Sequence, residues 1–528
     1  MQGRKDIQPK MMYQVSIDAL VPVDNFYRYL AQRLDLNFLY KATAKYYGAE
    51  GQESIDPVVF FKICLVGYLN NLNSDRRLMD YCSNCLDVRW YLKYDIDEAL
   101  PWHSTISRTR QLYGEEVFLS LFQHVLSLCV AKGMVRGKRQ AVDSAYIKAN
   151  ASMDSLLEKE VITDAAHYLA ELNEGSDYKV SQSVKKAVDR HHAWKAEEYK
   201  GMPGHVDNPK QEDENGILIR PKYLSNHTHY SPTDPDAKIS TKPGKARQLN
   251  YAGQLSVDDA HHVITGACAS SAGQRDSQNL AEILSQTIIN LTQNNLQAEQ
   301  LIADAGYSSG EALAFCEQNG IDAYIPNFGQ YKAHRDGFDY QKADNYYQCT
   351  KQGGKSAKLL FKGERTDSKG YTKKIYRSSE TDCKDCPLRA SCCGKVSKFK
   401  KLDDSIDKPY YDRMHQKLTS KPAYAKRLSR IRSRTVEPVL GTLINFMNMK
   451  RLNSRGIASA NKHVLLSALS YNLKKLMKFW RPKAKTVSNA MQKVNIKGKE
   501  LLLFSSEFSK AMLCILSYPR IRFAKIVF

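Results

Sequence analysis

The chain has 528 residues, of which 42% are hydrophobic and 25% are charged, and these are the proportions of a globular protein with several domains. They exclude a largely disordered chain, because the apolar residues suffice for at least one large core. No run reaches the roughly 18 apolar residues of a membrane span. The first residues also contain no apolar stretch typical of a secretory signal, so we expect a cytoplasmic protein with no membrane partner.

The net charge is distributed unevenly along the chain. It totals +22, from 78 Lys and Arg against 56 Asp and Glu. Residues 395–528 contain 30 basic and 7 acidic residues, a net +23, whereas the 394 residues before them contain 48 and 49, a net −1. A single lysine run can be a solvated face, but a whole quarter with this excess favours a polyanion as partner, most often nucleic acid.

The first 135 residues have the apolar periodicity of short helices. Asp56 and Pro57 have the order of an N-cap and a first-turn proline, and a mostly apolar helix follows them. Further amphipathic stretches lie over residues 78–90, 104–112 and 115–130. We therefore predict an N-terminal helical domain over residues 1–135. Such bundles often present one helix to DNA, and a purely structural role is the alternative.

Residues 136–345 have the pattern of a mixed α/β sheet. A strand over 137–150 has Asp143 near its centre, and a polar insertion of about residues 151–225 follows it. The elements expected next are a hairpin over 248–257 and 262–269, a helix capped by Asp276 or Ser277, a short strand leading into Asp304, a helix over 310–319 and a strand over 321–326. This order predicts an antiparallel meander that feeds parallel strands.

The last third of the chain contains a second small region and then helices. Residues 346–400 are rich in Lys, Gly, Thr and Tyr and predict a β-rich insert that contains cysteines. Residues 401–480 have a helical pattern and complete the α/β core, and 481–528 form a basic and apolar tail. Because Pro438 lacks an N–H, we expect a helix to begin or kink at Glu437 rather than pass through it.

Three acidic residues could build a site for phosphodiester chemistry. Asp143 and Asp304 fall on separate strands of one predicted sheet, and Glu437 falls on a helix. Cleavage of a phosphodiester requires charge neutralisation on the attacking and leaving oxygens, which two Mg²⁺ ions about 3.5–4 Å apart provide. Mg²⁺ prefers hard oxygen ligands such as carboxylates. From the residues alone, each of the three can equally be a helix cap or a solvated group.

The twelve cysteines are scattered along the chain except for one cluster. Cys383 and Cys386 have the two-residue spacing of a zinc knuckle, and thiolates hold Zn²⁺ tetrahedrally. Cys349 with either Cys392 or Cys393 would complete four ligands for one ion. Reduced thiols in a small β-rich insert are the alternative, since a disulfide framework is typical of short secreted chains.

Four stretches of the chain resemble the motifs of the DDE transposases of bacterial insertion sequences, which have an RNase H-like catalytic core. These stretches are residues 141–152 around Asp143, 250–258, 303–307 around Asp304, and 435–441 around Glu437, the last followed by Arg455 with Gly456 and by 471–475. The N-terminal helical region is also similar to the domain that precedes such cores. The likeness covers about residues 20–480.

This resemblance implies a catalytic triad and a reaction. The two bound ions would be Mg²⁺ or Mn²⁺, held by Asp143, Asp304 and Glu437. With them the protein would cut double-stranded DNA at the inverted repeats of a mobile element and join the ends to a target. It also implies a homodimer or larger assembly on DNA. The basic residues near the third acid that would contact DNA are Arg430, Arg432, Arg434, Lys450, Arg451 and Arg455.

The resemblance is incomplete around the third acid. Many relatives place a lysine seven residues after the glutamate, where this chain has Ile444. Many also place a tyrosine and an arginine before it, where this chain has Arg430 and Ser433. Two alternatives to a transposase stay open, namely a catalytically silent DNA-binding protein derived from one and a metal-dependent nuclease that does not integrate.

Overall fold

A computed structural model describes residues 15–480 of the protein, except for 49, 51–53, 159–210, 213–217, 220–224, 227–228, 241–245, 328, 330, 368–369 and 394–396. Most of the predicted polar insertion and the whole tail 481–528 therefore lie outside the described residues. The chain clusters into two compact units, Met1–Lys475 and Leu476–Phe528. Among the described helices none is long and apolar enough by itself to cross a membrane, although the bent pair His103–Leu112 and Glu115–Ala131 meets that test when taken together.

Short helices make up the N-terminal region. They are α1 (Ile17–Leu20), α2 (Phe26–Arg33), α3 (Phe38–Thr43), α4 (Pro57–Leu69), α5 (Asp75–Asn84), α6 (Leu86–Leu92), α7 (His103–Leu112) and α8 (Glu115–Ala131). The predicted start of α4 is confirmed, because Asp56 Oδ1 accepts hydrogen bonds from the backbone N–H groups of Val58 and Val59 at 2.6 and 3.2 Å. The stretch expected over 78–90 is divided into two helices by extended backbone at Cys85.

A six-stranded mixed sheet forms the centre of the protein, in the order β10-β9-β1-β7-β6, with β8 also paired to β7. The strands are β1 (Arg139–Lys148), β6 (Lys238–Ser240), β7 (Gln248–Asp258), β8 (Ile264–Ser271), β9 (Gln300–Ile302) and β10 (Asp322–Tyr324). Strand β1 is antiparallel to β7 and parallel to β9. The predicted α/β class and the meander that feeds parallel strands are thus confirmed. β1 has a partner on each side and is the strand around which the sheet is organised.

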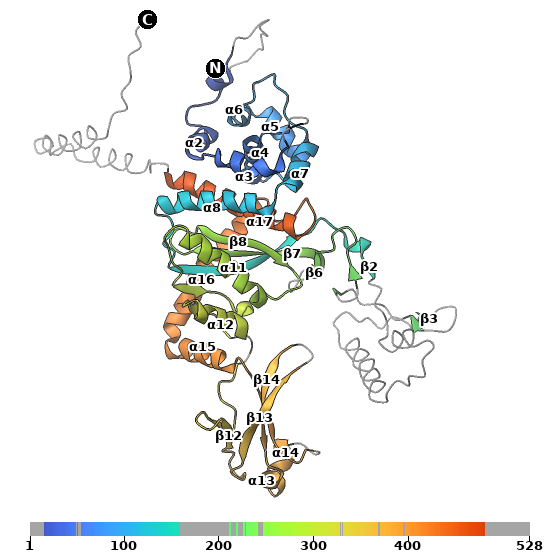
Figure 1. The fold of residues 1–528 in the computed structure, drawn as a ribbon, viewed down its shortest axis with the longest axis vertical. Helices are drawn as coiled ribbons and strands as arrows, with labels where there is room; N and C mark the ends of the chain where they lie inside the picture. Colours follow the sequence, from blue (N-terminus) through green and yellow to red (C-terminus); the bar gives the residue numbers. More distant parts are fainter. Residues whose placement is uncertain are drawn as a thin grey trace, which may run out of the picture. The chain divides into compact units, whose positions relative to one another are not determined.

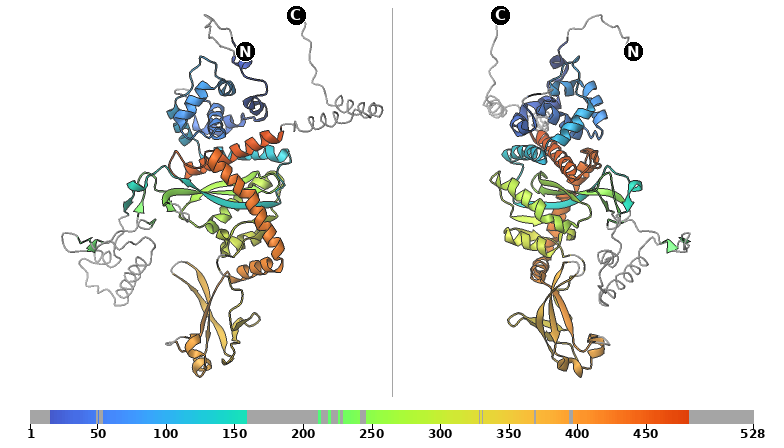
Figure 2. Two further views of the ribbon diagram at one scale, coloured as in Figure 1. Left: turned by 180° about the vertical axis from the view of Figure 1, so that it is seen from behind. Right: turned by 45° about the vertical axis from the view of Figure 1, so that its right-hand side comes forward.

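Helices cover both faces of this sheet (Figures 1 and 2). On one face lie α11 (Asp276–Thr292) and α12 (Gly310–Gln318), and on the other lie α17 (Ile457–Trp480) and α8. Two glycines mark how closely the layers approach. A methyl group added to Gly266 would meet Thr287 of α11, and one added to Gly253 would meet Val464 of α17. The contacts on both sides leave little room for larger side chains at these strand positions.

The outer edge of β8 is bonded by amide side chains rather than by another strand. Asn472 of α17 accepts a hydrogen bond from the backbone N–H of Ile264 and donates one to its carbonyl, both at 2.8 Å. Asn461 accepts from the N–H of Ala269 at 3.0 Å, and Asn290 of α11 donates to the carbonyl of Thr265 at 2.8 Å. An unpaired edge would otherwise leave buried polar groups without partners.

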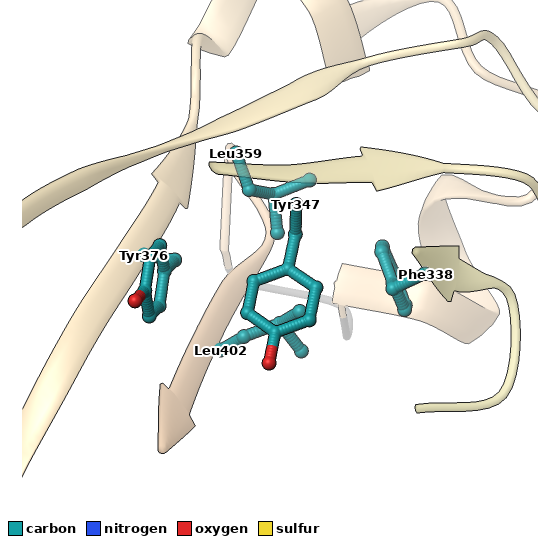
Figure 3. Close-up of a cluster of buried hydrophobic side chains, with 5 residues drawn as sticks. All are labelled: Phe338, Tyr347, Leu359, Tyr376 and Leu402. Atoms are coloured by element: carbon teal, nitrogen blue, oxygen red, sulfur yellow. The ribbon is translucent and has the colours of Figure 1, made fainter. Parts of the chain in front are cut away.

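A second, five-stranded antiparallel sheet forms the insert. It comprises β11 (Phe338–Gln341), β12 (Tyr346–Cys349), β13 (Lys358–Thr366), β14 (Thr372–Ser378) and β15 (Lys401–Ser405), paired in that order, with the short helices α13 (Glu380–Lys384) and α14 (Arg389–Cys393) between the last two strands. The strands begin before and end after the predicted bounds of 346–400. One small cluster fills the interior, as Figure 3 shows: Phe338, Tyr347, Leu359, Tyr376 and Leu402.

Two long helices follow the insert after α15 (Lys408–Ser420), namely α16 (Pro422–Phe446) and α17. We expected a helix to begin or kink at Glu437. No helix begins there, because α16 runs through Pro438. Proline deprives the carbonyl of residue 434 of its usual donor. Arg434 and Pro438 both lie on the exposed side of α16, where water can replace that donor. α16 packs against β1, β7 and β9.

Buried polar contacts join the N-terminal helices to α17. The hydroxyl of Tyr68 on α4 lies 2.6 Å from Nδ1 of His463 on α17. Nearby, Arg110 on α7 donates two hydrogen bonds to Asp75 on α5, at 2.9 and 2.8 Å. Burial and then the Arg110 charge lower the pKa of His463 to about 4. The imidazole is therefore neutral at this junction at neutral pH.

This histidine gives a pH-dependent contribution to stability. In the unfolded chain a histidine has a pKa near its ordinary value of about 6.5, so between about pH 6.5 and 4 the unfolded chain binds a proton that the folded chain does not. We expect the free energy of unfolding to fall over that range by up to about 3 kcal/mol because of this residue. The difference between wild type and His463→Gln in denaturant titrations at several pH values measures it. An identical pH slope in both proteins would contradict a neutral buried His463.

Candidate active site

The alternation of side chains along β1 separates Asp143 from Ser144. Successive residues of a strand point to opposite faces of a sheet. Asp143 is contacted by Arg432 of α16, whereas Ser144 is contacted by Asp276 in the first turn of α11. One strand therefore supplies a carboxylate to one helix layer and a hydroxyl to the other.

The guanidinium of Arg432 joins two of the predicted site acids. Its Nη1 donates to Oδ2 of Asp143 at 2.7 Å, and its Nη2 donates to Oε1 of Glu437 at 3.1 Å. The side chains of Arg432 and Asp143 are only 15% and 18% exposed, while that of Glu437 is 54% exposed. Asp143 and Glu437, from a strand and a helix far apart in sequence, thus share one cation at a partly open position.

Asp304 lies at the end of the neighbouring strand. It is the N-cap of a short 3-10 helix, η3 (Ala305–Tyr307), and its Oδ1 accepts a hydrogen bond from the N–H of Gly306 at 2.9 Å. Burial raises the pKa of Asp143, and the negative charge of Asp304 acts in the same direction. The Ser144 N–H and the Arg432 guanidinium oppose this rise. Because β1 and β9 are parallel neighbours, Asp143 and Asp304 come near each other at one end of the sheet.

A fourth carboxylate, that of Asp276, supports the opposite face. Its Oδ1 accepts hydrogen bonds from Ser144 Oγ at 2.7 Å and from Gln254 Nε2 at 3.3 Å, and Tyr307 donates to Gln254 Oε1 at 2.6 Å. Burial, followed by the charges of Asp276, Asp143 and Asp304, raises the pKa of Tyr307 well above its ordinary value. Its hydroxyl therefore stays a neutral donor beside the acids.

Sequence reasoning missed this supporting network. We expected Asp276 or Ser277 to cap α11, and this is wrong, because Arg275 is the N-cap and Asp276 is the first helical residue. Its carboxylate is turned toward β1 and β7 instead of its own helix end. Gln254 and Tyr307 lie inside two of the motif stretches, 250–258 and 303–307, so the motifs could have indicated that these residues belong near the site. Asp276 lies outside all of them.

The predicted DNA-contacting residues fall into two groups. Five of them are exposed, namely Arg430, Arg434, Lys450, Arg451 and Arg455. Lys450 and Arg451 run alongside the end of β1, where the Lys450 carbonyl accepts a hydrogen bond from the N–H of Lys148 at 3.1 Å. Arg432 differs, because two carboxylates hold its side chain within the candidate site.

The donor set fits a hard divalent cation. Asp143, Asp304 and Glu437 offer carboxylate oxygens, which Mg²⁺ and Mn²⁺ prefer. Among the described residues, no three His, Cys, Asp or Glu side chains already form a group with the spacing of a metal site. The guanidinium of Arg432 bridges Asp143 and Glu437, so it places one positive charge between these two acids.

Two stretches of the chain match known protein families. Residues 15–112 match the family model of a transposase domain (DUF772), and residues 349–477 match that of a transposase DDE domain. No curated protein matches the chain. The two matches support an insertion-sequence DDE transposase.

The second match indicates a type of chemistry at the level of the family. At the level of the family, the DDE domain indicates an enzyme that cleaves and transesterifies DNA, and DDE transposases generally use divalent metal ions. Residues 349–477 contain Glu437, Arg432 and the cysteine cluster. Asp143 and Asp304 lie before the matched stretch, so their assignment depends on the motifs around them and on the geometry of the sheet.

The Arg432 bridge makes a test of the metal site possible without DNA. If the guanidinium competes with a divalent ion for Asp143 and Glu437, its removal by Arg432→Gln should tighten Mn²⁺ binding roughly tenfold, because a positive charge no longer opposes the ion. Isothermal titration with Mn²⁺ measures this. Arg434→Gln, at an exposed position of the same helix, is the matched control and should leave the affinity unchanged. Weaker binding in Arg432→Gln would mean that Arg432 orients the acids for the metal rather than competing with it.

Proposed function

We propose that the protein is an active transposase that binds the terminal inverted repeats of its own mobile element, cuts the DNA there and transfers the ends to a target. The observation that carries this proposal is the sharing of one guanidinium by Asp143 and Glu437 beside Asp304. Each of the three acids lies in a different motif stretch. The arrangement of strands and helices around them supports an RNase H-like core.

In this proposal Asp143, Asp304 and Glu437 hold the divalent ions. When bound, such ions supply charge neutralisation and activation of the attacking oxygen in phosphodiester cleavage. The chain's own residues prepare the position. Burial of Asp143 restricts its access to water, the Gly306 N–H fixes the carboxylate of Asp304, and Glu437 reaches the site from the exposed side of α16.

The network on the opposite face holds the strand that carries Asp143. Asp276 binds Ser144 and Gln254, and Tyr307 binds Gln254, so the segments on either side of Asp143 and Asp304 are tied to each other. A methyl group added to Gly306 would lie 3.1 Å from Asp304 Oδ1 and 3.5 Å from Asp276 Oδ2. The contact with Asp304 is tight, so a larger residue at this position would require the Asp304 carboxylate to shift, whereas the distance to Asp276 is an ordinary contact.

Binding to double-stranded DNA follows from the charge of the last quarter and from the five exposed basic residues near the third acid. Phosphates attract such side chains without regard to sequence. Arg432 is not counted among them, because Asp143 and Glu437 hold it. Assembly into a homodimer or larger complex on DNA is part of the proposal, since two element ends must be brought together.

A donor plasmid that carries the element with its own flanking DNA tests catalysis. With Mg²⁺ present, Asp143→Asn, Asp304→Asn and Glu437→Gln should each reduce end cleavage by about 100-fold or more, because each removes a carboxylate that would hold the metal ions, and those ions neutralise the charge of the transition state. DNA binding, measured by gel shift, should stay near wild type in all three. Glu311→Gln, at an exposed acid of α12, is the control and should cleave normally.

The same assay separates the alternatives. Wild-type protein that binds the ends but never cuts them is a silent DNA-binding protein, and cleavage without joined products indicates a nuclease that does not integrate. Cleavage near the wild-type rate in any one of the three acid variants removes that residue from the site.

The salt dependence of DNA binding tests the basic surface. Each phosphate contact adds roughly one to the slope of log affinity against log salt concentration. The double variant Arg451→Gln with Arg455→Gln should therefore reduce the slope by about 2. Arg413→Gln is the control, because Arg413 is already paired with Glu317 at 2.7 Å. An unchanged slope in the double variant would exclude both residues from the DNA-contacting surface.

A further inference from the structure

The insert has little apolar interior with which to hold its shape. Its buried cluster consists of Phe338, Tyr347, Leu359, Tyr376 and Leu402. The cluster packs between the strands (Figure 3), and Cys349 and Cys392 are the partly buried residues that contact it. Regions of this size are usually stabilised by an additional element such as disulfides or a structural metal. The helices α13 and α14 in particular contribute only one buried residue, Cys383.

Five cysteines surround a single small cavity beside this cluster. The cavity is lined by Cys349 from β12, Cys383 from α13, Cys386 from the following turn, and Cys392 and Cys393 from α14. Its volume is about 20 Å³, which is room for one water-sized particle. Segments that are up to 44 positions apart, from Cys349 to Cys393, thus place cysteines around one ion-sized space.

Three of these sulfurs have hydrogen-bond partners around the cavity. The backbone N–H groups of Lys355 and Leu388 donate to the sulfur of Cys386. Ser378 Oγ lies 3.1 Å from Cys383 Sγ, and Cys393 is hydrogen-bonded to Cys383 as well. The thiolate is the form of cysteine that binds metal, so metal binding at this position would release the thiol protons.

Basic side chains line the same cavity. They are Lys351, Lys355, Arg389 and Lys400. Four thiolates around one Zn²⁺ carry a net charge of −2, since each contributes one negative charge. Lys355 is also paired with Asp385 at 3.5 Å, and Lys400 donates a hydrogen bond to the carbonyl of Cys392 at 2.7 Å. The basic side chains together would offset the negative charge of a zinc–thiolate centre.

We propose that the insert contains a structural Zn²⁺ site formed by Cys349, Cys383, Cys386 and one of Cys392 and Cys393. The sulfurs must turn into the cavity to bind, since no three of the described cysteines already form a ligand group. Closing the shell fixes α13 and α14 against the sheet and provides the insert with the stabilisation that its small cluster lacks. The site is independent of the proposed DNA chemistry, because it shares no residue with the acidic site.

Metal analysis of the full-length protein tests this proposal. Protein purified without chelator from zinc-supplemented culture should contain about one zinc per chain by elemental analysis. Cys383→Ser and Cys386→Ser should each lose it, and one of Cys392→Ser and Cys393→Ser should lose it while the other keeps it. Cys85→Ser is the matched control, because Cys82 and Cys85 have the same spacing but belong to the N-terminal helical region, far from the insert in sequence.

Variants that fail to fold do not decide the question, because the wild-type protein is itself informative. Chelator-treated wild type refilled with Co²⁺ should show the intense visible bands of tetrahedral thiolate coordination. Negligible zinc together with the absence of those bands would overturn the proposal. Iron and sulfide in stoichiometric amounts would also overturn it, because they would identify an iron–sulfur cluster. The loss of two free thiols that a reductant restores would overturn it as well, because it would identify a disulfide.

Discussion

The contact between Arg432 and the two carboxylates of Asp143 and Glu437 joins the long helix α16 to the central strand β1. Carboxylates held close together repel one another, and the repulsion grows as burial lowers the local dielectric constant. A guanidinium at hydrogen-bond distance from two of them offsets that repulsion without a metal ion. The same contact links α16 to β1. It therefore helps to position the long helix and also offsets the negative charge of the two acids.

The position of β1 allows helices on both faces of the sheet to contact the strand that carries Asp143. Because it has strands on either side and helices on both faces, its alternating residues reach two different layers. Asp143 meets α16, and Ser144 meets Asp276 at the start of α11. Asp143 faces α16 on one side of the sheet, and the hydrogen bonds of Asp276 to Ser144 and Gln254 support the same strand from the other side. Rigid support of this kind is what a site needs to hold charged groups close together.

The central sheet and the insert are stabilised in different ways. In the central sheet, large apolar layers cover both faces, and amide side chains from α11 and α17 bond the edge of β8. The insert has a single small cluster and a cavity surrounded by thiols and basic side chains. The first region is held by extensive packing, whereas the second has little apolar packing of its own. This contrast is the physical reason to look for a metal in the insert.

Local patterns in the sequence determined much of this protein. The period of apolar residues and the turn residues predicted the α/β class, the N-cap at Asp56, and the strands that carry Asp143 and lead to Asp304, because these features depend on near neighbours. The break at Cys85, the passage of α16 through Pro438 and the turn of Asp276 away from its own helix end were decided by tertiary structure. Each depends on the side chains or solvent that surround the segment after folding. The local sequence does not indicate these contacts, because the partners lie far away in the chain. The pairing of Arg432 with two acids is the clearest case, since only the docking of a helix on a strand brings them within reach.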